Sequence, residues 1–265
     1  PLFIVDGFES TLEAVYNMDI NRIASITILK DAASTAIYGS KAANGVVVVE
    51  TVKPKIGQLR LSYNGSVAMS NPDLTSYNLM NSAEKLEFER LAGRYNKTGQ
   101  DSYETMIDKA EAYTKKLADI KSGVDTYWLS EPLRTGWNQR HNVYVDGGAE
   151  GFLFGIGLNY NGNNGVMKDS KRETYGGNID LIYRVGKLQF QDKFSASYTN
   201  QANPIVDFSQ YAAANPYYKK YDEDGKVSPW LEYTDIAHAS NPLYNASLNS
   251  RNKGNNLVIS NSFAA

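Results

Sequence analysis

Residues 175–199 read YGGNIDLIYRVGKLQFQDKFSASYT, two runs of alternating apolar and polar side chains joined by a turn at 185–187. Alternation of this kind is the period of a β-strand that has one face in apolar and the other in polar surroundings. The first run places Tyr175, Ile179 and Tyr183 on one face, and the second places Phe190 and Phe194 on the matching face. Each run reaches the ~9–11 residues that a tilted strand needs to cross a bilayer.

Four more segments of residues 58–265 carry the same pattern, so we expect six strands. The clearer two are 59–70 and 152–160, and the weaker two are 141–145 and 257–263. Short links at 146–151 and 185–187 alternate with long connections at 71–137, 163–173 and 200–255. Outer-membrane β-barrels have short turns on one side and long loops on the other. A soluble sandwich has no physical reason for that asymmetry, and the pattern favours a barrel.

Asp192 conflicts with this assignment. It has the parity of Phe190 and Phe194, which we assign to lipid. A charge at the bilayer midplane is costly, and the cost falls toward the interfaces. Either a β-bulge at this position or a location near the headgroups would remove the conflict.

The composition excludes several classes of protein. The chain has 265 residues, with 27 Lys and Arg against 29 Asp and Glu, so no basic excess favours nucleic-acid binding. It contains no cysteine, and its two histidines, His141 and His238, fit no metal or catalytic spacing. The run at 222–225 resembles the start of a calcium loop but lacks the later oxygen ligands. We therefore expect no enzyme, no metal site and no cofactor.

The first 57 residues have a different organisation. Apolar runs at 2–5 and 46–49 predict buried strands, and residues 23–29 predict another, anchored by Ile23, Ile26 and Ile28. A helix over 32–38 is expected after Asp31, whose charge suits a helix N-terminus. Gly39 would end this helix. These features predict a small mixed α/β unit.

The run from Leu29 to Val47, LKDAASTAIYGSKAANGVV, resembles the plug-domain signature of TonB-dependent outer-membrane transporters, and more narrowly that of the SusC/RagA branch. The run from Pro1 to Gly7 is similar to the strand that precedes it in that branch. After the valines, Glu50-Thr51-Val52-Lys53 departs mildly from the family pattern. The resemblance implies a plug role, chiefly as turns and helix ends, for Asp6, Gly7, Lys30, Asp31, Tyr38, Gly39, Asn44 and Gly45.

The resemblance also implies an architecture and an activity. Residues 1–57 would be the C-terminal part of the plug, and residues 58–265 the first six strands of a 22-stranded barrel. Such a protein imports oligosaccharides or peptides across the outer membrane of a Bacteroidota-like cell. Its partners would be a SusD-like surface lipoprotein and the TonB complex, whose box is not in this sequence. Six strands cannot close a barrel, so we expect a segment of a longer protein.

The long connections carry further candidates. Asn81 to Glu84 resembles a capping box, and Ser102 can cap a second helix that Gly123 closes. These helices either pack on neighbouring loops or form a docking surface for a partner. The loop at 200–255 is rich in aromatic residues that could hold a sugar or peptide, or could pack on one another: Tyr211, Tyr217, Tyr218, Tyr221, Trp230 and Tyr233.

Two other functions stay open from the sequence. One is a soluble extracellular carbohydrate-binding β module, and the other is an outer-membrane barrel that does not transport. A need for detergent separates the membrane protein from the soluble module, and a plug-like unit in the lumen argues for transport.

Overall fold

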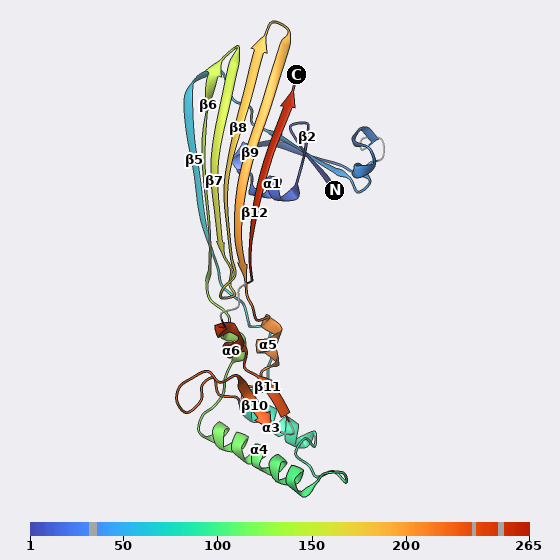
Figure 1. Ribbon diagram of the computed structural model, residues 1–265, viewed down its shortest axis with the longest axis vertical. Helices are drawn as coiled ribbons and strands as arrows, with labels where there is room; N and C mark the ends of the chain where they lie inside the picture. Colours follow the sequence, from blue (N-terminus) through green and yellow to red (C-terminus); the bar gives the residue numbers. More distant parts are fainter. Residues whose placement is uncertain (32–35, 235–236, 249–251) are drawn as a thin grey trace.

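The computed structural model describes residues 1–31, 36–234, 237–248 and 252–265. It has three parts, which Figure 1 shows as a long sheet, a small domain beside it, and a group of loops and helices beyond one end. We call residues 1–56 the N-terminal domain and the long six-stranded sheet the wall. No helix among the described residues is both long and apolar enough to span a bilayer.

The wall confirms the expected antiparallel strands. Its order is β12-β9-β8-β7-β6-β5, so chain neighbours are spatial neighbours except where the last long connection separates β9 from β12. The strands are β5 (Gly57–Ser70), β6 (Gly136–Ala149), β7 (Phe152–Asn164), β8 (Lys171–Val185), β9 (Leu188–Asn203) and β12 (Asn252–Ala264).

The strands extend further than the alternating pattern predicted. The connection expected at 163–173 lies between Asn164 and Lys171, and the one expected at 200–255 lies between Asn203 and Asn252. The added residues are mostly polar, so they show no apolar alternation. Ladder hydrogen bonds join backbone groups and do not depend on the side chains. The strands therefore continue past the apolar band.

The two faces of the wall have opposite character. The outward face carries exposed apolar side chains such as Leu59, Leu61 and Leu158, the first 67% exposed. The inward face carries buried polar ones such as Asn142 and Asp180, 6% and 7% exposed. A water-soluble sheet would place these classes the other way round. The arrangement fits an outward face in lipid.

Two rows of aromatic rings bracket the outward face. Register pairs His141 with Tyr160, Tyr160 with Tyr175, and Tyr175 with Tyr198. A second row, near the short turns, pairs Phe152 with Tyr183 and Tyr183 with Phe190. Eight residues separate the levels of Phe152 and Tyr160, which is roughly 20 Å of height for a strand tilted by ~40°. Aromatic girdles flank the apolar band of membrane barrels at a similar separation.

Asp192 lies one side-chain level from the second aromatic row, because it is two residues from Phe190 on β9 in the direction of Tyr198. It pairs with Leu181 and Phe263, and the register through it is continuous on both sides. A β-bulge is therefore excluded. The ring of Phe263 also contacts that of Phe190, with centroids 6.2 Å apart. The level favours the other explanation, a carboxylate near the headgroups at one edge of the apolar band.

The N-terminal domain is a four-stranded sheet of order β2-β1-β4-β3. Ile4, Ala42 and Val46 form its buried core, against which Leu29 and Tyr38 pack. Its elements are β1 (Leu2–Val5), β2 (Phe8–Ser10), α1 (Leu12–Asn17), η1 (Ile20–Arg22), β3 (Ile23–Leu29), η2 (Ala36–Tyr38), η3 (Ser40–Ala42) and β4 (Val46–Thr51). The small mixed domain was expected, and β1 and β4 lie side by side in parallel.

Two expectations for this domain need comment. Ile26 and Ile28 do not anchor β3 in the core, because this edge strand turns both side chains away from it and leaves them more than half exposed. The helix expected over 32–38 lies partly outside the described residues, and its last three residues form a 3₁₀ turn.

The loop region joins two segments that are distant in sequence (Figure 1). The first contains α3 (Ser82–Leu91), α4 (Tyr103–Lys121) and η4 (Trp128–Ser130). The second contains α5 (Phe208–Ala213), β10 (Trp230–Thr234), β11 (Ala237–Ser240) and α6 (Pro242–Ser247). The expected caps are confirmed, because Asn81 and Glu84 form a capping box and Ser102 accepts a hydrogen bond from the Thr105 N–H.

Gly45→Ala should destabilise the N-terminal domain by roughly 1–3 kcal/mol. Gly45 has a φ of +86°, and a Cβ there would lie 3.0 Å from the Leu29 carbonyl oxygen. The measurement is the rate of proteolysis within the first 57 residues of the detergent-solubilised protein. Gly99→Ala is the matched control, since nothing lies near its Cβ position. Equal proteolysis of the two variants would contradict the strain at Gly45.

Candidate functional site: the contact between the N-terminal domain and the wall

A buried cluster of charges joins the N-terminal domain to the inward face of the wall. Arg22 Nη2 lies 2.9 Å from Asp180 Oδ2, and Lys193 Nζ lies 3.4 Å from Asp180 Oδ1. Lys193 also forms an ion pair with Asp6. All four side chains are at most 17% exposed. Two cations and two carboxylates thus balance one another across the contact.

Asp6 has two roles. With φ of 49° at Asp6 and 90° at Gly7, the pair forms the tight turn between β1 and β2. The Asp6 carboxylate also accepts hydrogen bonds from Thr51 N at 2.8 Å and from Thr51 Oγ1. Burial alone would raise the pKa of Asp6, but the hydrogen bonds from Lys193 and Thr51 outweigh burial and hold the pKa below its ordinary value. Asp6 therefore stays ionised, which keeps the cluster balanced.

The sequence predicted the turn but not the ion pairs. Asp180 and Lys193 are register partners on β8 and β9, and both have inward parity. Opposite charges on adjacent strands of the polar face were the available signal. No sequence pattern indicated the ion pair of Arg22, because its partner Asp180 lies 158 residues away.

Arg22 also stacks on the wall. Its guanidinium carbon lies 3.4 Å from the centre of the Tyr144 ring, a cation–π contact. Tyr144 lies across Gly155, where a Cβ would collide with the Tyr144 hydroxyl. Arg22 Nη1 and the Tyr144 hydroxyl are buried without a partner within the described chain. Both groups can therefore form hydrogen bonds with water that enters the contact.

Other polar contacts join the N-terminal domain to the wall at other points along the strands. Asn64 Nδ2 donates to Asp19 Oδ2 at 3.1 Å, and Arg172 Nη2 lies 2.6 Å from Glu13 Oε1. A cavity of about 290 Å³ remains between the two parts. Its lining is rich in hydroxyl and amide groups, among them those of Thr11, Asn17, Asn142, Asn178, Ser195 and Ser197.

The other expected motif residues shape the N-terminal domain. Tyr38 packs on its core, while Gly39 and Gly45, with φ of 69° and 86°, flank η3. Lys30 and Asp31 are exposed after β3, and Asn44 is exposed before Gly45. Their positions are those of turns and element ends.

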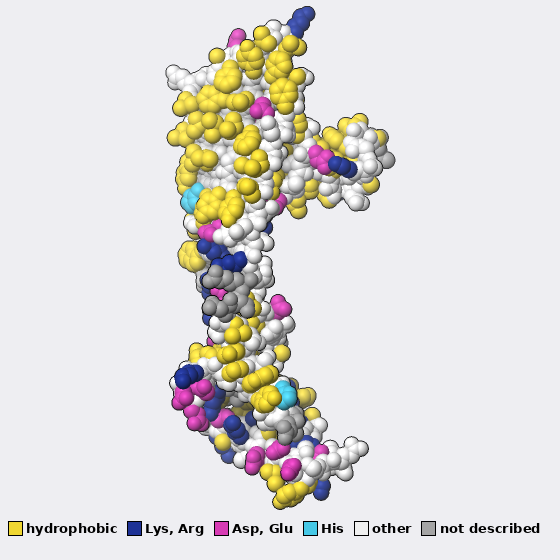
Figure 2. All heavy atoms as spheres, in the orientation of Figure 1, with side chains coloured by type: hydrophobic (Ala, Val, Ile, Leu, Met, Phe, Trp, Pro, Cys, Tyr) yellow, Lys and Arg dark blue, Asp and Glu magenta, His cyan; other side chains and the backbone are white. Residues whose placement is uncertain are grey.

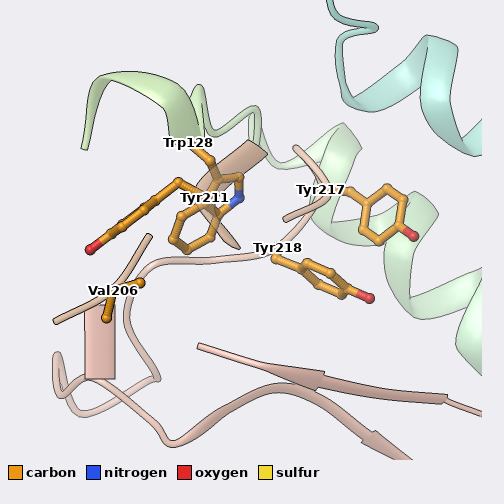
Figure 3. Packing of buried hydrophobic residues seen from close by; sticks show 5 residues of the cluster. All are labelled: Trp128, Val206, Tyr211, Tyr217 and Tyr218. Atoms are coloured by element: carbon orange, nitrogen blue, oxygen red, sulfur yellow. The ribbon is translucent and has the colours of Figure 1, made fainter. Parts of the chain in front are cut away.

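The aromatic candidates of the long loop divide into two groups. Tyr211, Tyr217 and Tyr218 are buried with Trp128 and Val206, as Figure 3 shows, and Tyr217 is only 2% exposed. Burial raises the pKa of Tyr217 and of Tyr218 above the ordinary value. In this conformation these three rings cannot stack on a ligand, so for them the structure favours the second alternative, packing within the loop.

The other three rings remain accessible. Tyr221, Trp230 and Tyr233 are exposed, Tyr233 by 64%. The centroids of Trp230 and Tyr233 lie 5.1 Å apart, and Tyr233 stacks on His238 at 4.5 Å. Trp230 and Tyr233 on the β10–β11 hairpin, and Tyr221 before it, are the candidates of this loop that can still meet a sugar or peptide.

A buried polar network explains why Tyr217 and Tyr218 are internal. The Tyr217 hydroxyl donates to Glu89 of α3 at 2.9 Å, and the Tyr218 hydroxyl donates to Glu232 of β10. Lys116 of α4 lies 2.8 Å from Glu232. These contacts connect the two long loops, and no sequence pattern revealed them, because Glu89 and Tyr217 are 128 residues apart.

Comparison with known proteins shows what this chain is similar to. The family profile described as TonB-dependent Receptor Plug Domain matches residues 1–46. The TonB-dependent receptor SusC of Bacteroides thetaiotaomicron is 28% identical over 215 residues, covering 78% of this chain and 19% of SusC. The TonB-dependent receptor P26 of Formosa agariphila is 29% identical over 255 residues, covering 94% of this chain and 24% of P26. The chain thus spans about a fifth to a quarter of these relatives.

Solved structures show the same fold. The RagAB peptide importer in its closed-closed state matches with a TM-score of 0.70 at 23% identity, covering 92% of this chain and 30% of that one. Its open-open state matches with a TM-score of 0.69 at 24% identity, covering 98% and 32%. At this identity the likeness establishes the fold alone.

Lys193→Met should loosen the N-terminal domain from the wall, because it leaves Asp6 and Asp180 buried with too little positive charge. Removing one partner of a buried ion pair costs about 3–5 kcal/mol. The measurement is the thermal unfolding midpoint of the detergent-solubilised protein. Lys41→Met removes the exposed pair with Glu9 and should change stability by less than about 1 kcal/mol. A midpoint for Lys193→Met as high as that of the control would show that the cluster does not hold the domain.

Proposed function

We propose that this chain, which belongs to the SusC/RagA type of TonB-dependent transporter, forms the plug and the first wall strands of an outer-membrane nutrient importer. We assign residues 1–57 to the plug and 58–265 to the barrel. The observation that carries the proposal is the plug's ionic contact with the polar face of a sheet whose other face is apolar.

The chemistry of the contact suits a plug that moves. Separating two apolar surfaces would cost about 25 cal/mol for every Å² returned to water. Charged and hydrogen-bonding groups form much of the contact here, and apolar side chains such as Val5, Phe8 and Met18 line the cavity of about 290 Å³ between the two parts. Water that enters can hydrate Asp6, Asp180 and Lys193 as the ion pairs part. A pull on the plug from the periplasmic side through the TonB complex would open the lumen this way.

The substrate class we propose is an oligosaccharide or a peptide. Trp230 and Tyr233 offer exposed ring faces above the wall, and such faces stack on sugar rings and on peptide groups. RagAB, which shares the fold, is described as a peptide importer.

The proposed partner is a SusD-like lipoprotein that covers the loop region. Helices α3 and α4 expose Phe88, Leu91 and Tyr103, the last by 75%. Apolar side chains gathered on helices outside the lipid belt are typical of a protein interface. We locate the transporter in the outer membrane of a Bacteroidota-like cell.

Two measurements on the native protein test the proposal. Mass spectrometry of the complex purified from cells should identify a co-purifying lipoprotein and a bound oligosaccharide or peptide. The protein should require detergent and should migrate faster on SDS gels before heating than after it. Purification from buffer alone would favour a soluble carbohydrate-binding module, and a detergent-dependent protein with neither ligand nor lipoprotein would favour a non-transporting barrel.

The double variant Asp19→Cys/Asn64→Cys should lock the plug to the wall. The two short side chains are hydrogen-bonded at 3.1 Å, and the chain has no cysteine of its own. Uptake of the ligand identified by mass spectrometry should stop under oxidising conditions and recover on reduction. Each single cysteine variant is a control that cannot form the bond. Normal uptake by the fully oxidised double variant would show that this contact does not open during transport.

A further inference from the structure

The outward face of the wall ends in a row that carries two lysines. Register pairs Trp137 with Asn164, Asn164 with Lys171, and Lys171 with Ala202, which pairs with Lys253 on its other side. Both lysines therefore lie on the same face in one register row. One strand separates them, so their backbones are about 10 Å apart.

The backbone of this row lies at the outer edge of the headgroup layer, and a long lysine side chain can reach back into that layer. Lys171 lies four residues beyond Tyr175, and Lys253 lies four beyond Leu257, the neighbour of Tyr198 in the tyrosine row. Four residues of a strand tilted by ~40° rise roughly 10 Å. The headgroup region extends on the order of 5–8 Å beyond the hydrocarbon on each side. Figure 2 shows Lys and Arg side chains gathered where the sheet meets the loops, next to a histidine and to apolar side chains.

Both ammonium groups can reach an external anion. The Lys171 side chain is 48% exposed and pairs with Glu173 at 3.0 Å, and a pair this exposed contributes little free energy. Glu173 also accepts a hydrogen bond from the Tyr160 hydroxyl at 3.2 Å, so its carboxylate keeps a hydrogen-bond donor when Lys171 turns toward another anion. Lys253 is exposed on β12.

We propose that Lys171 and Lys253 bind the phosphate of an anionic lipid in the outer leaflet. The two ammonium groups supply the charge that a phosphate headgroup requires. The rings of Tyr175 and Tyr198, and the apolar face beyond them, lie where the acyl chains of that lipid would run. A free phosphate ion would leave these apolar contacts unused, which is why a lipid is the better occupant. The inference rests on the membrane location in the proposed function.

Native mass spectrometry of the full-length transporter tests this site, with phosphatidylglycerol added to the detergent micelles and phosphatidylcholine as the zwitterionic comparison. Lys171→Gln/Lys253→Gln should bind phosphatidylglycerol roughly thirtyfold more weakly than the wild type, since each of the two lysines near a headgroup contributes about 1 kcal/mol. Binding of phosphatidylcholine should not change. Lys97→Gln/Lys226→Gln removes the same charge from exposed positions in the loop region and should bind as the wild type does.

The outcomes separate the explanations. Unchanged phosphatidylglycerol binding by Lys171→Gln/Lys253→Gln would overturn the site, as would an equal loss in Lys97→Gln/Lys226→Gln or displacement of the lipid by inorganic phosphate. Lys171→Arg/Lys253→Arg should restore binding, and heat-dependent migration on SDS gels should confirm that each variant is folded. A wild-type protein that needed no detergent would overturn the membrane location itself.

Discussion

In hydrocarbon there is no water to hydrogen-bond the backbone, so each N–H and C=O of a spanning segment needs a partner within the protein. The wall meets this condition with ladders that run unbroken between neighbouring strands from β6 to β12. A continuous ladder fixes the register, and the register fixes which side chains share a level. The two aromatic rows, the position of Asp192 and the lysine row all follow from it. A slip of one residue would turn every apolar side chain toward the plug.

The same alternation supplies the polar face against which the plug lies. Because lipid takes most apolar side chains of each strand, the opposite parity is left mainly with amides, hydroxyls and charges, and the apolar Leu153 and Ile182 on that face are buried. Asp180 and Lys193 are adjacent on that face and would neutralise each other without the plug. Arg22 and Asp6 turn the pair into a balanced group of four. The plug is thus held by charge complementarity and not by a shared apolar core, which suits a contact that water can reopen.

The loop region solves a different problem, since it lies beyond the lipid and must fold as an ordinary water-soluble part. It does so by burying two tyrosines whose hydroxyls donate to carboxylates. Tyr217 donates to Glu89 of the other loop, and Tyr218 donates to Glu232 of its own loop, which Lys116 of the other loop neutralises. Tyr217 and Glu89 would each be costly to bury alone, and together they are satisfied. Rings that the composition marked as ligand contacts are therefore structural, while Trp230 and Tyr233 on the hairpin keep their faces in solvent.

The sequence by itself determined the strands, their parity, the caps of α3 and α4 and the family resemblance, because each depends on residues close together in the chain. Local spacing decides which face a side chain takes and where a helix begins. Only the tertiary structure decided that Asp6 pairs with Lys193, that Arg22 stacks on Tyr144, that Tyr217 is buried and that Ile26 and Ile28 are exposed. These facts depend on segments up to 187 residues apart being brought together by the ladder and the plug. The residues near a side chain in the sequence do not identify a partner that far away in the chain.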